Sequence, residues 1–290
     1  IGSDTTGFDA TLNLETLTNS ASGTIQSAQD LNLHLKTSVD NSGKLLADRD
    51  LLVDATDSAS TLALTNQSTG VMQASALLTI KGTNDASNVT LDTQAGTLLG
   101  DQVQLTLTSL DNTGTVQAEQ DIQLVLASSL NNVSKIIAGT DLKITSGDAS
   151  TTLNVSNQTD AVIQAGGLLK INNSSNADNV TLDTQAGTLL AEQIDLKLSS
   201  LNNAGTLQSN QDMSLAIRNS LSNSGTLLAK TTLDTTAQTV INSGILQATQ
   251  GVTLTATSLE NSGTLIGSDT AGIDVNFDLE TLTNSASGTI

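Results

Sequence analysis

The stretch LNNAGTLQSNQDMSLAI, residues 201–217, decides the fold, because close copies of it recur along almost the whole chain. Its pattern is Leu-x-Asn-x-Gly-Thr-Leu-x-Ser/Ala, then a polar step that often ends in Asp, then aliphatic residues at alternate positions. Alternation with a period of two predicts β-strands, and the Asn and Gly between the aliphatic runs predict a turn. One copy of the pattern therefore predicts one coil of a solenoid.

The alternation also assigns the side chains of this coil to its two sides. We expect an inward set of Leu201, Leu207, Ser209, Met213, Leu215 and Ile217, and an outward set of Thr206, Gln208, Ser214 and Ala216. Each buried aliphatic side chain contributes about 1.5–3 kcal/mol, which offsets only part of the ordering entropy of a coil. Stability is therefore expected to come from neighbouring coils stacked about 4.8 Å apart.

The coils are grouped into a longer repeat. A shift of 91 residues carries the string NVTLDTQAGTLL at 88–99 onto an identical string at 179–190, and one such period holds four coils. Polar excursions at 81–87 and 172–178 occupy equivalent places in it, so they are expected to project as loops on one edge. Residues 1–25 and 266–290 agree at 19 of 25 positions, and the last coil is incomplete. We therefore expect one continuous segment, 1–290, excerpted from a longer array.

The composition excludes several classes of function. Ten Lys and Arg residues against 29 Asp and Glu residues give a net charge of −19, whereas nucleic acids and anionic membranes attract clustered basic side chains. The chain has no cysteine, one histidine and no apolar run long enough to span a membrane. We expect no nucleic-acid partner, no membrane insertion, no cofactor and no metal site. The absence of proline fits strands that are paired on both sides.

Asparagine recurs at the third position of the repeat unit. These residues are Asn19, Asn41, Asn112, Asn132, Asn203, Asn223, Asn242, Asn261 and Asn284. Identical amides on stacked coils can hydrogen-bond along the axis, so we predict a structural Asn ladder rather than amides that line a sugar-binding groove. The glycines that follow in the same turns, such as Gly114 and Gly205, are expected to supply positive φ angles.

At these residues the chain resembles the filamentous-haemagglutinin-type repeats of bacterial two-partner-secretion exoproteins, which include large adhesins and contact-dependent growth-inhibition proteins. The motif L-x-N-x-G-T-[LIV]-x-[AS], as in LNNAGTLQS, LSNSGTLLA and LDNTGTVQA, carries the resemblance. It implies a right-handed parallel β-helix, a solenoid of about 13 coils with roughly 20 residues each, exported by an outer-membrane transporter to the cell surface. The family's Asn-Pro-rich secretion domain is absent from these residues, as is any C-terminal toxin.

Paired carboxylates would be the sign of an enzyme, because hydrolysis of a polysaccharide needs an acid and a base on one face. The candidates are Asp30 with Asp50 and Asp121 with Asp141, on neighbouring coils. Stacked in this way they could also hold Ca²⁺. They recur on the schedule of the repeat, however, and no Lys or Arg recurs with them, so the prediction is turn-forming aspartates and no catalytic residue.

The remaining polar and aromatic residues carry smaller predictions. The acidic patch of Asp48, Asp50, Asp54 and Asp57 around Arg49 lacks the spacing of known calcium loops, which predicts a solvated face. His34 lies between two leucines and is expected to point outward. The only aromatic residues, Phe8 and Phe277, are expected to fill the core of buried strands.

The function predicted from the sequence is a structural one: a stalk segment of a secreted bacterial cell-surface exoprotein that presents a distal adhesive or toxin domain and is not an enzyme. A host or bacterial surface receptor would then be contacted through other regions. Two alternatives stay open, a directly binding adhesin face and a polysaccharide-active β-helix enzyme. The first would be favoured by exposed aromatics and the second by a charged cluster that breaks the repeat, and the sequence contains neither.

Overall fold

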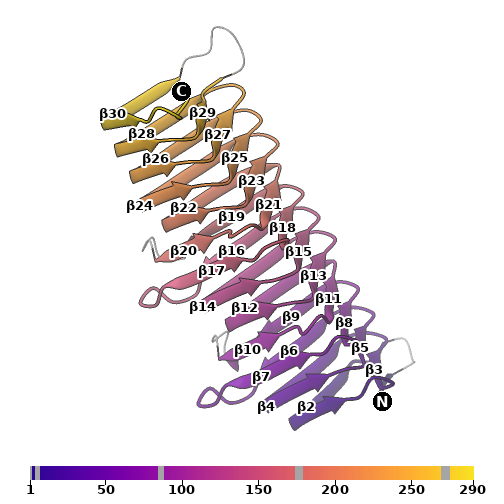
Figure 1. Cartoon of the computed structure of the whole chain (residues 1–290). Coiled ribbons are helices and arrows are strands. Elements are labelled where there is room, and N and C mark those ends of the chain that lie inside the picture. Colours follow the sequence, from indigo (N-terminus) through magenta and orange to yellow (C-terminus); the bar gives the residue numbers. More distant parts are fainter. Residues whose placement is uncertain (1, 4–6, 84–87, 174–178, 269–274) are drawn as a thin grey trace.

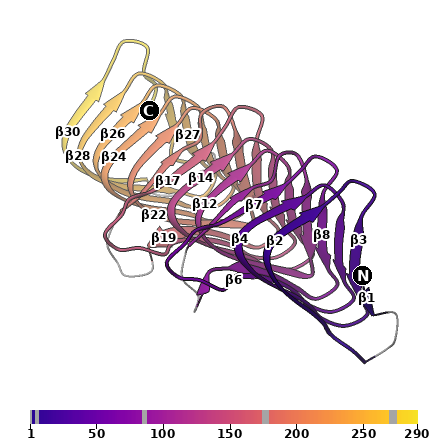
Figure 2. The same ribbon diagram turned by 90° about the horizontal axis from the view of Figure 1, so that it is seen from below.

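The strands of the protein wind into a parallel β-helix, whose stacked coils are drawn in Figure 1 and seen from below in Figure 2. The computed structural model describes residues 2–3, 7–83, 88–173, 179–268 and 275–290. Strands of successive coils pair in parallel and in register, so that Val116 lies beside Ile136 and Leu201 beside Leu221. This confirms the all-β solenoid predicted from the sequence. The described residues contain no helix long and apolar enough to cross a membrane.

One side of the β-helix is a thirteen-stranded sheet to which each coil contributes one short strand, in agreement with the expected coil number. Its strands are β1 (Gly2–Ser3), β3 (Thr24–Ser27), β5 (Lys44–Ala47), β8 (Val71–Ala74), β11 (Thr97–Gly100), β13 (Thr115–Ala118), β15 (Lys135–Ala138), β18 (Val162–Ala165), β21 (Thr188–Ala191), β23 (Thr206–Ser209), β25 (Thr226–Ala229), β27 (Ile245–Ala248) and β29 (Thr264–Ile266).

The rest of each coil belongs to a seventeen-stranded sheet with two arms. In nine coils one long strand runs through both arms: β2 (Ala10–Asn19), β4 (Leu31–Asn41), β12 (Gln102–Asn112), β14 (Ile122–Asn132), β22 (Gln193–Asn203), β24 (Met213–Asn223), β26 (Leu233–Asn242), β28 (Val252–Asn261) and β30 (Asn276–Asn284). In four coils the arms are separate strands: β6 (Leu51–Ala55) and β7 (Leu62–Asn66), β9 (Leu77–Lys81) and β10 (Val89–Asp92), β16 (Leu142–Ser146) and β17 (Leu153–Asn157), β19 (Leu168–Asn173) and β20 (Val180–Asp183).

The corner between the two arms, here called the loop corner, sets the length of a coil. Where long strands cross it, the register shifts by a residue in several pairs, as between Leu107 and Ser109 of β12. Where the arms are separate, the connecting residues are 56–61, 82–88, 147–152 and 174–179. The coil from Thr93 to Asn112 is therefore 19 residues long, and the one from Asn66 to Thr93 is 27. Four coils separate Asn41 from Asn132, as the 91-residue period predicts.

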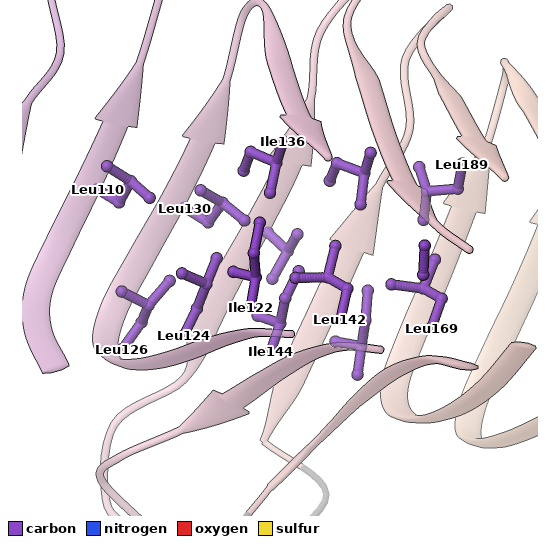
Figure 3. Packing of buried hydrophobic residues seen from close by; sticks show 14 of the residues in the cluster. Leu110, Ile122, Leu124, Leu126, Leu130, Ile136, Leu142, Ile144, Leu169 and Leu189 are labelled. Atoms are coloured by element: carbon purple, nitrogen blue, oxygen red, sulfur yellow. The ribbon is translucent and has the colours of Figure 1, made fainter. Parts of the chain in front are cut away.

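The interior is a continuous column of aliphatic side chains (Figure 3). In the coil of β14 and β15, Ile122, Leu124, Leu126, Leu130 and Ile136 all point inward and are at most 1% exposed. Their counterparts in the next coil stack on them, since the register pairs Leu124 with Ile144. A coil thus completes its core only through its neighbours, as expected for a repeat that cannot fold alone.

The predicted sides of the coil at 201–217 are confirmed. Leu201, Leu207, Met213, Leu215 and Ile217 are buried, whereas Ser214 and Ala216 are exposed.

The expectation for Phe8 is wrong. Its side chain is 65% exposed, because β2 begins only at Ala10 and Phe8 precedes it. Phe277, in β30, is partly buried against the core.

The inward and outward assignment can be tested by a pair of neighbouring substitutions. Leu215→Asp places an unpaired carboxylate in the aliphatic column and should lower the free energy of unfolding by at least a few kcal/mol. Ser214→Asp puts the same carboxylate on an exposed position and should change it by about 0.5 kcal/mol or less. Urea unfolding followed by circular dichroism measures both, and equal losses would contradict the assignment.

Candidate functional site

The predicted asparagines lie in one column, at the corner where the seventeen-stranded sheet turns into the thirteen-stranded sheet. Each is the last residue of its strand, and all except Asn284 point into the buried interior. Two further asparagines, Asn66 at the end of β7 and Asn157 at the end of β17, occupy the same place. These two are not among the asparagines predicted from the sequence, although Gly70 follows Asn66 after four residues, as Gly23 follows Asn19.

Hydrogen bonds run along this column from one coil to the next. The Asn112 Nδ2 atom donates to Asn132 Oδ1 at 2.7 Å and to the backbone oxygen of Lys135 at 3.0 Å. Asn132 repeats both contacts with Asn157 and Val162, at 2.7 and 3.2 Å. Each amide therefore satisfies its donors inside the protein, where an unpaired polar group would be costly. Little of these side chains is left for a ligand.

Threonine replaces asparagine at two levels of the column, Thr93 and Thr184. Thr93 Oγ1 donates to Asn112 Oδ1 at 2.9 Å and accepts the Gly114 N–H at 2.8 Å. On its other side Asn66 turns its amide to the backbone oxygens of Gly70 and Thr97. The same arrangement recurs 91 residues later, where Thr184 donates to Asn203 Oδ1 at 2.7 Å. The amide chain is thus divided into three segments.

The expectation of positive φ angles for the turn glycines is wrong. Among the described glycines only Gly7 and Gly251 have positive φ angles in the left-handed region. A Cβ atom on Gly114 would lie 2.0 Å from the Gly96 carbonyl oxygen, and one on Gly205 would lie 2.0 Å from the Gly187 oxygen. These turns need glycine because neighbouring backbones stack too closely for a side chain.

The candidate carboxylate pairs lie at a second corner, where the thirteen-stranded sheet turns into the first arm. Asp121 Oδ1 accepts the hydroxyl of Thr140 and the backbone N–H of Asp141, the latter at 3.1 Å. Asp141 Oδ1 in turn accepts the backbone N–H of Leu168 at 2.8 Å. Each carboxylate therefore caps the backbone of the following coil.

The first pair is held in the same way. Asp30 accepts hydrogen bonds from Arg49 and from the Asp50 N–H, and Asp50 Oδ1 accepts the Leu77 N–H at 3.0 Å. The Arg49 guanidinium lowers the pKa of Asp30, which keeps this carboxylate ionised. An ionised and capped carboxylate is poorly suited to act as a general acid. In the part of the chain that the structure describes, no group of three His, Asp or Glu side chains is placed to hold a metal ion.

The acidic patch around Arg49 does not form one cluster. Arg49 reaches Asp30 and, at 3.6 Å, Asp9 of the preceding coils. Asp54 faces outward and lies 2.6 Å from Nδ1 of His34. His34 is therefore on the outer surface, as predicted, and is paired there.

The loop corner carries more excursions than the sequence predicts. Most of the two expected loops, residues 84–87 and 174–178, lies outside the described residues, and the strands before and after them, β9 and β10 or β19 and β20, meet at this corner. Each expected loop is preceded, one coil earlier, by a second loop at 56–61 or 147–152. Asn88 Nδ2 donates to the backbone oxygens of Asp57 and Ser60, both at 2.8 Å, and fastens the first pair together. Asn179 contacts the oxygens of Asp148 and Ala149 in the second pair.

Fold and side-chain columns together define a repetitive solenoid whose polar residues bond to its own backbone. A family model described as a haemagglutinin repeat matches residues 5–69, 90–164, 150–196, 191–244 and 236–290, so the chain belongs to the haemagglutinin repeat family. This confirms the resemblance to filamentous-haemagglutinin-type repeats. Repeats of this family build segments of secreted adhesins, a typically non-enzymatic class. Searches of curated proteins and of solved structures found no match.

The asparagine column can be tested at Asn132. Asn132→Ala removes the acceptor of Asn112 and the donor to Asn157, and each orphaned buried group costs about 1–3 kcal/mol. The neighbouring Asn131→Ala removes side-chain bonds only at the outer surface, to Asp111 and Gln158, and is the matched control. Asn132→Thr should recover part of the loss, because Thr93 and Thr184 show that threonine fits the column. Equal melting temperatures for the two alanine variants would contradict a structural column.

A pH dependence is expected at the loop of residues 147–152. The hydroxyl and the backbone N–H of Ser150, together with the hydroxyl of Thr151, lower the pKa of Asp148 to about 2. A carboxyl whose folded-state pKa is lowered stabilises the fold above its ordinary value of 3.8, and this contribution is lost as the pH falls toward 2.

The measurement compares the thermal midpoints of the wild type and Asp148→Asn over this acidic range. The advantage of the wild type should be constant above pH 3.8 and should vanish on acidification toward the folded-state pKa. Asp234→Asn removes an exposed charge from the outer face and serves as control. A wild-type advantage that persists at the lowest pH would refute the assigned contacts.

Proposed function

We propose that this chain is one continuous stalk segment of a secreted bacterial cell-surface exoprotein, and that it presents a distal adhesive or toxin domain. The observation that carries the proposal is the unbroken stacking of coils in one register, supported by buried hydrogen bonds along the axis. Thirteen strands at about 4.8 Å span nearly 60 Å. On this proposal, such a segment holds a distal domain at a fixed distance from the cell and has no catalytic role.

The chemistry of the repeats supports the same function. The recurring aspartates cap neighbouring coils, and the recurring asparagines bond to one another. These contacts leave few convergent groups for catalysis on a substrate. On this proposal the chain meets an outer-membrane transporter during export, and a host or bacterial receptor is bound by other parts of the exoprotein. Contact-dependent inhibition proteins and adhesins are both exported by such a transporter on this proposal, so either class fits as the full-length protein to which this segment belongs.

One hollow on the first arm favours the alternative of a directly binding face. Its volume is about 290 Å³, and it is lined by in-register outward side chains of four coils, Gln104, Gln123, Lys143 and Lys170, together with Asp121 and Asp141 at the neighbouring corner. Lys170 Nζ lies 2.5 Å from Asp195 Oδ2. Amide, ammonium and carboxylate groups in one hollow would suit the hydroxyl groups of a glycan, which both donate and accept hydrogen bonds.

A cell-binding measurement separates the stalk from the adhesin. The purified chain, labelled with a fluorophore, is titrated onto host and bacterial cells. A stalk should show no saturable binding. Saturable binding that Lys143→Glu weakens, and that the exposed Lys230→Glu leaves unchanged, would replace the stalk by an adhesin face. Turnover of a polysaccharide by the same preparation would overturn both the stalk and the adhesin function.

A further inference from the structure

The described strands of the thirteen-stranded sheet contain no acidic residue, although the chain carries a net charge of −19. Acids that border its outer face, such as Asp101, Glu119 and Glu192, lie at the corner that directly follows the strands. Strands of the other sheet do contain them, for example Asp111, Asp195 and Asp234. The only charged side chains within the thirteen strands are Lys44 and Lys135. Electrostatic repulsion of another acidic chain is therefore weakest over the strands themselves, away from the corner that carries Asp101, Glu119 and Glu192.

Two kinds of residue alternate strictly along the central outward row of this face. Odd levels carry glutamine: Gln26, Gln73, Gln117, Gln164, Gln208 and Gln247. Even levels carry an aliphatic residue: Leu46, Leu99, Ile137, Leu190, Leu228 and Ile266. The pattern thus has a period of two coils, or about 9.6 Å, over twelve consecutive levels.

The alternation shapes the surface into ridges and hollows. A glutamine side chain is longer than the leucine or isoleucine side chain on the coils next to it, so hollows form above the aliphatic levels. One lies over Leu99 between Gln73 and Gln117, is bordered at the corner by Asp101 and Glu119, and has a volume of about 360 Å³. Its counterpart 91 residues later lies over Leu190 between Gln164 and Gln208, with about 190 Å³.

The amides on these ridges have no partner within the described part of the chain, in contrast to glutamines at the corners. Gln120 donates to Asp101 at 2.8 Å, and Gln211 donates to Glu192 at 2.7 Å. No such bond fixes the six glutamines of the row. Their donors and acceptors are available to a partner that carries groups at the same spacing.

We propose that this face docks a second copy of the chain, antiparallel to the first, with the glutamine ridges of each copy seated in the aliphatic hollows of the other. A twofold axis that runs along the strand direction keeps the row opposite itself while it reverses the order of the coils. With the axis between Ile137 and Gln164, every glutamine faces an aliphatic residue: Gln208 faces Leu99, and Gln117 faces Leu190. A twofold axis parallel to the β-helix would place the row opposite a different one.

The dimensions fit a stable pair. Twelve levels at about 4.8 Å, each about 13 Å wide, bury roughly 750 Å² per copy, within the usual size range of specific interfaces. A second copy is also a straight partner with the same two-coil period, and closed twofold symmetry pairs one surface with itself. An extended neutral polysaccharide is the other straight occupant, but the row has no aromatic residue on which sugar rings could stack.

The first experiment is sedimentation of the complete 290-residue chain over a concentration series. The wild type should dimerise, and the double variant Leu99→Lys/Leu190→Lys should raise the dimer dissociation constant at least about 100-fold, since each change occurs twice in the interface. Ser214→Lys/Thr253→Lys places the same charges on exposed positions of the other sheet and should leave the dimer unchanged. Circular dichroism confirms that both variants are folded.

The second experiment determines the relative orientation of the two copies by cysteine cross-linking. The chain has no native cysteine, so only the introduced cysteines can react. Leu99→Cys and Gln208→Cys are prepared separately and treated with a bismaleimide of about 10 Å, the spacing of packed sheets. A covalent dimer should form in the mixture of the two variants and not with either alone. Cross-linking of Leu99→Cys to itself would overturn the antiparallel arrangement. A monomeric wild type in the sedimentation experiment would overturn the proposal. Retention of the wild type on cellulose or chitin, lost in the double lysine variant, would instead assign the face to a glycan.

Discussion

The hydrogen bond between buried amides of successive coils is the constraint on which the rest of the structure depends. An asparagine side chain inside an aliphatic column must find partners for both of its N–H groups, because burial without them is costly. Asn203 finds them in the Asn223 amide and the Thr226 backbone, and both belong to the next coil. A coil can supply these partners only when it is stacked in register. The column thus ties the register of each coil to its neighbour.

This constraint fixes two corners of the coil and leaves the third free. The asparagine column holds the turn into the thirteen-stranded sheet, and backbone capping by residues such as Asp121 and Asp141 holds the turn out of it. Although the turn after the asparagine column also varies, from two residues after Asn41 to four after Asn66, most of the variation in coil length, from 19 to 27 residues, arises at the loop corner. Insertions at this corner cost little, since loop closure depends weakly on length. The super-repeat is therefore visible mainly as a periodic pattern of loops on one edge.

The outward surfaces are free of the constraint and differ in chemistry. Strands of the two-armed sheet carry acids and border a hollow with two lysines and two aspartates, whereas the described strands of the thirteen-stranded sheet carry no acid and alternate glutamine with aliphatic residues. Inward positions can hardly change without loss of packing, because interiors are close-packed. Distinctions between members of such a repeat family are therefore expected on the outer faces and at the loop corner.

What the sequence by itself determined is whatever follows from local periodicity. The alternation around Leu215 assigns strands and their buried side, and the identical strings 91 residues apart fix the super-repeat. Similar reasoning found nine of the column's asparagines but missed Asn66 and Asn157, whose place in the column follows from the pairing of their strands. It also gave a positive φ angle as the reason for glycine at position 114. Glycine is needed there because a Cβ atom would collide with the carbonyl oxygen of Gly96 in the preceding coil.

Only the tertiary structure decided which residues of different coils are neighbours. Coil lengths vary, so members of the glutamine and aliphatic row lie between 18 and 27 residues apart, and no fixed spacing reveals them. The pairing of Asp121 with the backbone of the following coil is hidden in the same way, because a capping contact depends on how two corners are superimposed. Strand periodicity is a property of consecutive residues and can be read from them. Register between coils is a property of the folded stack, and it determines the surfaces that this protein presents.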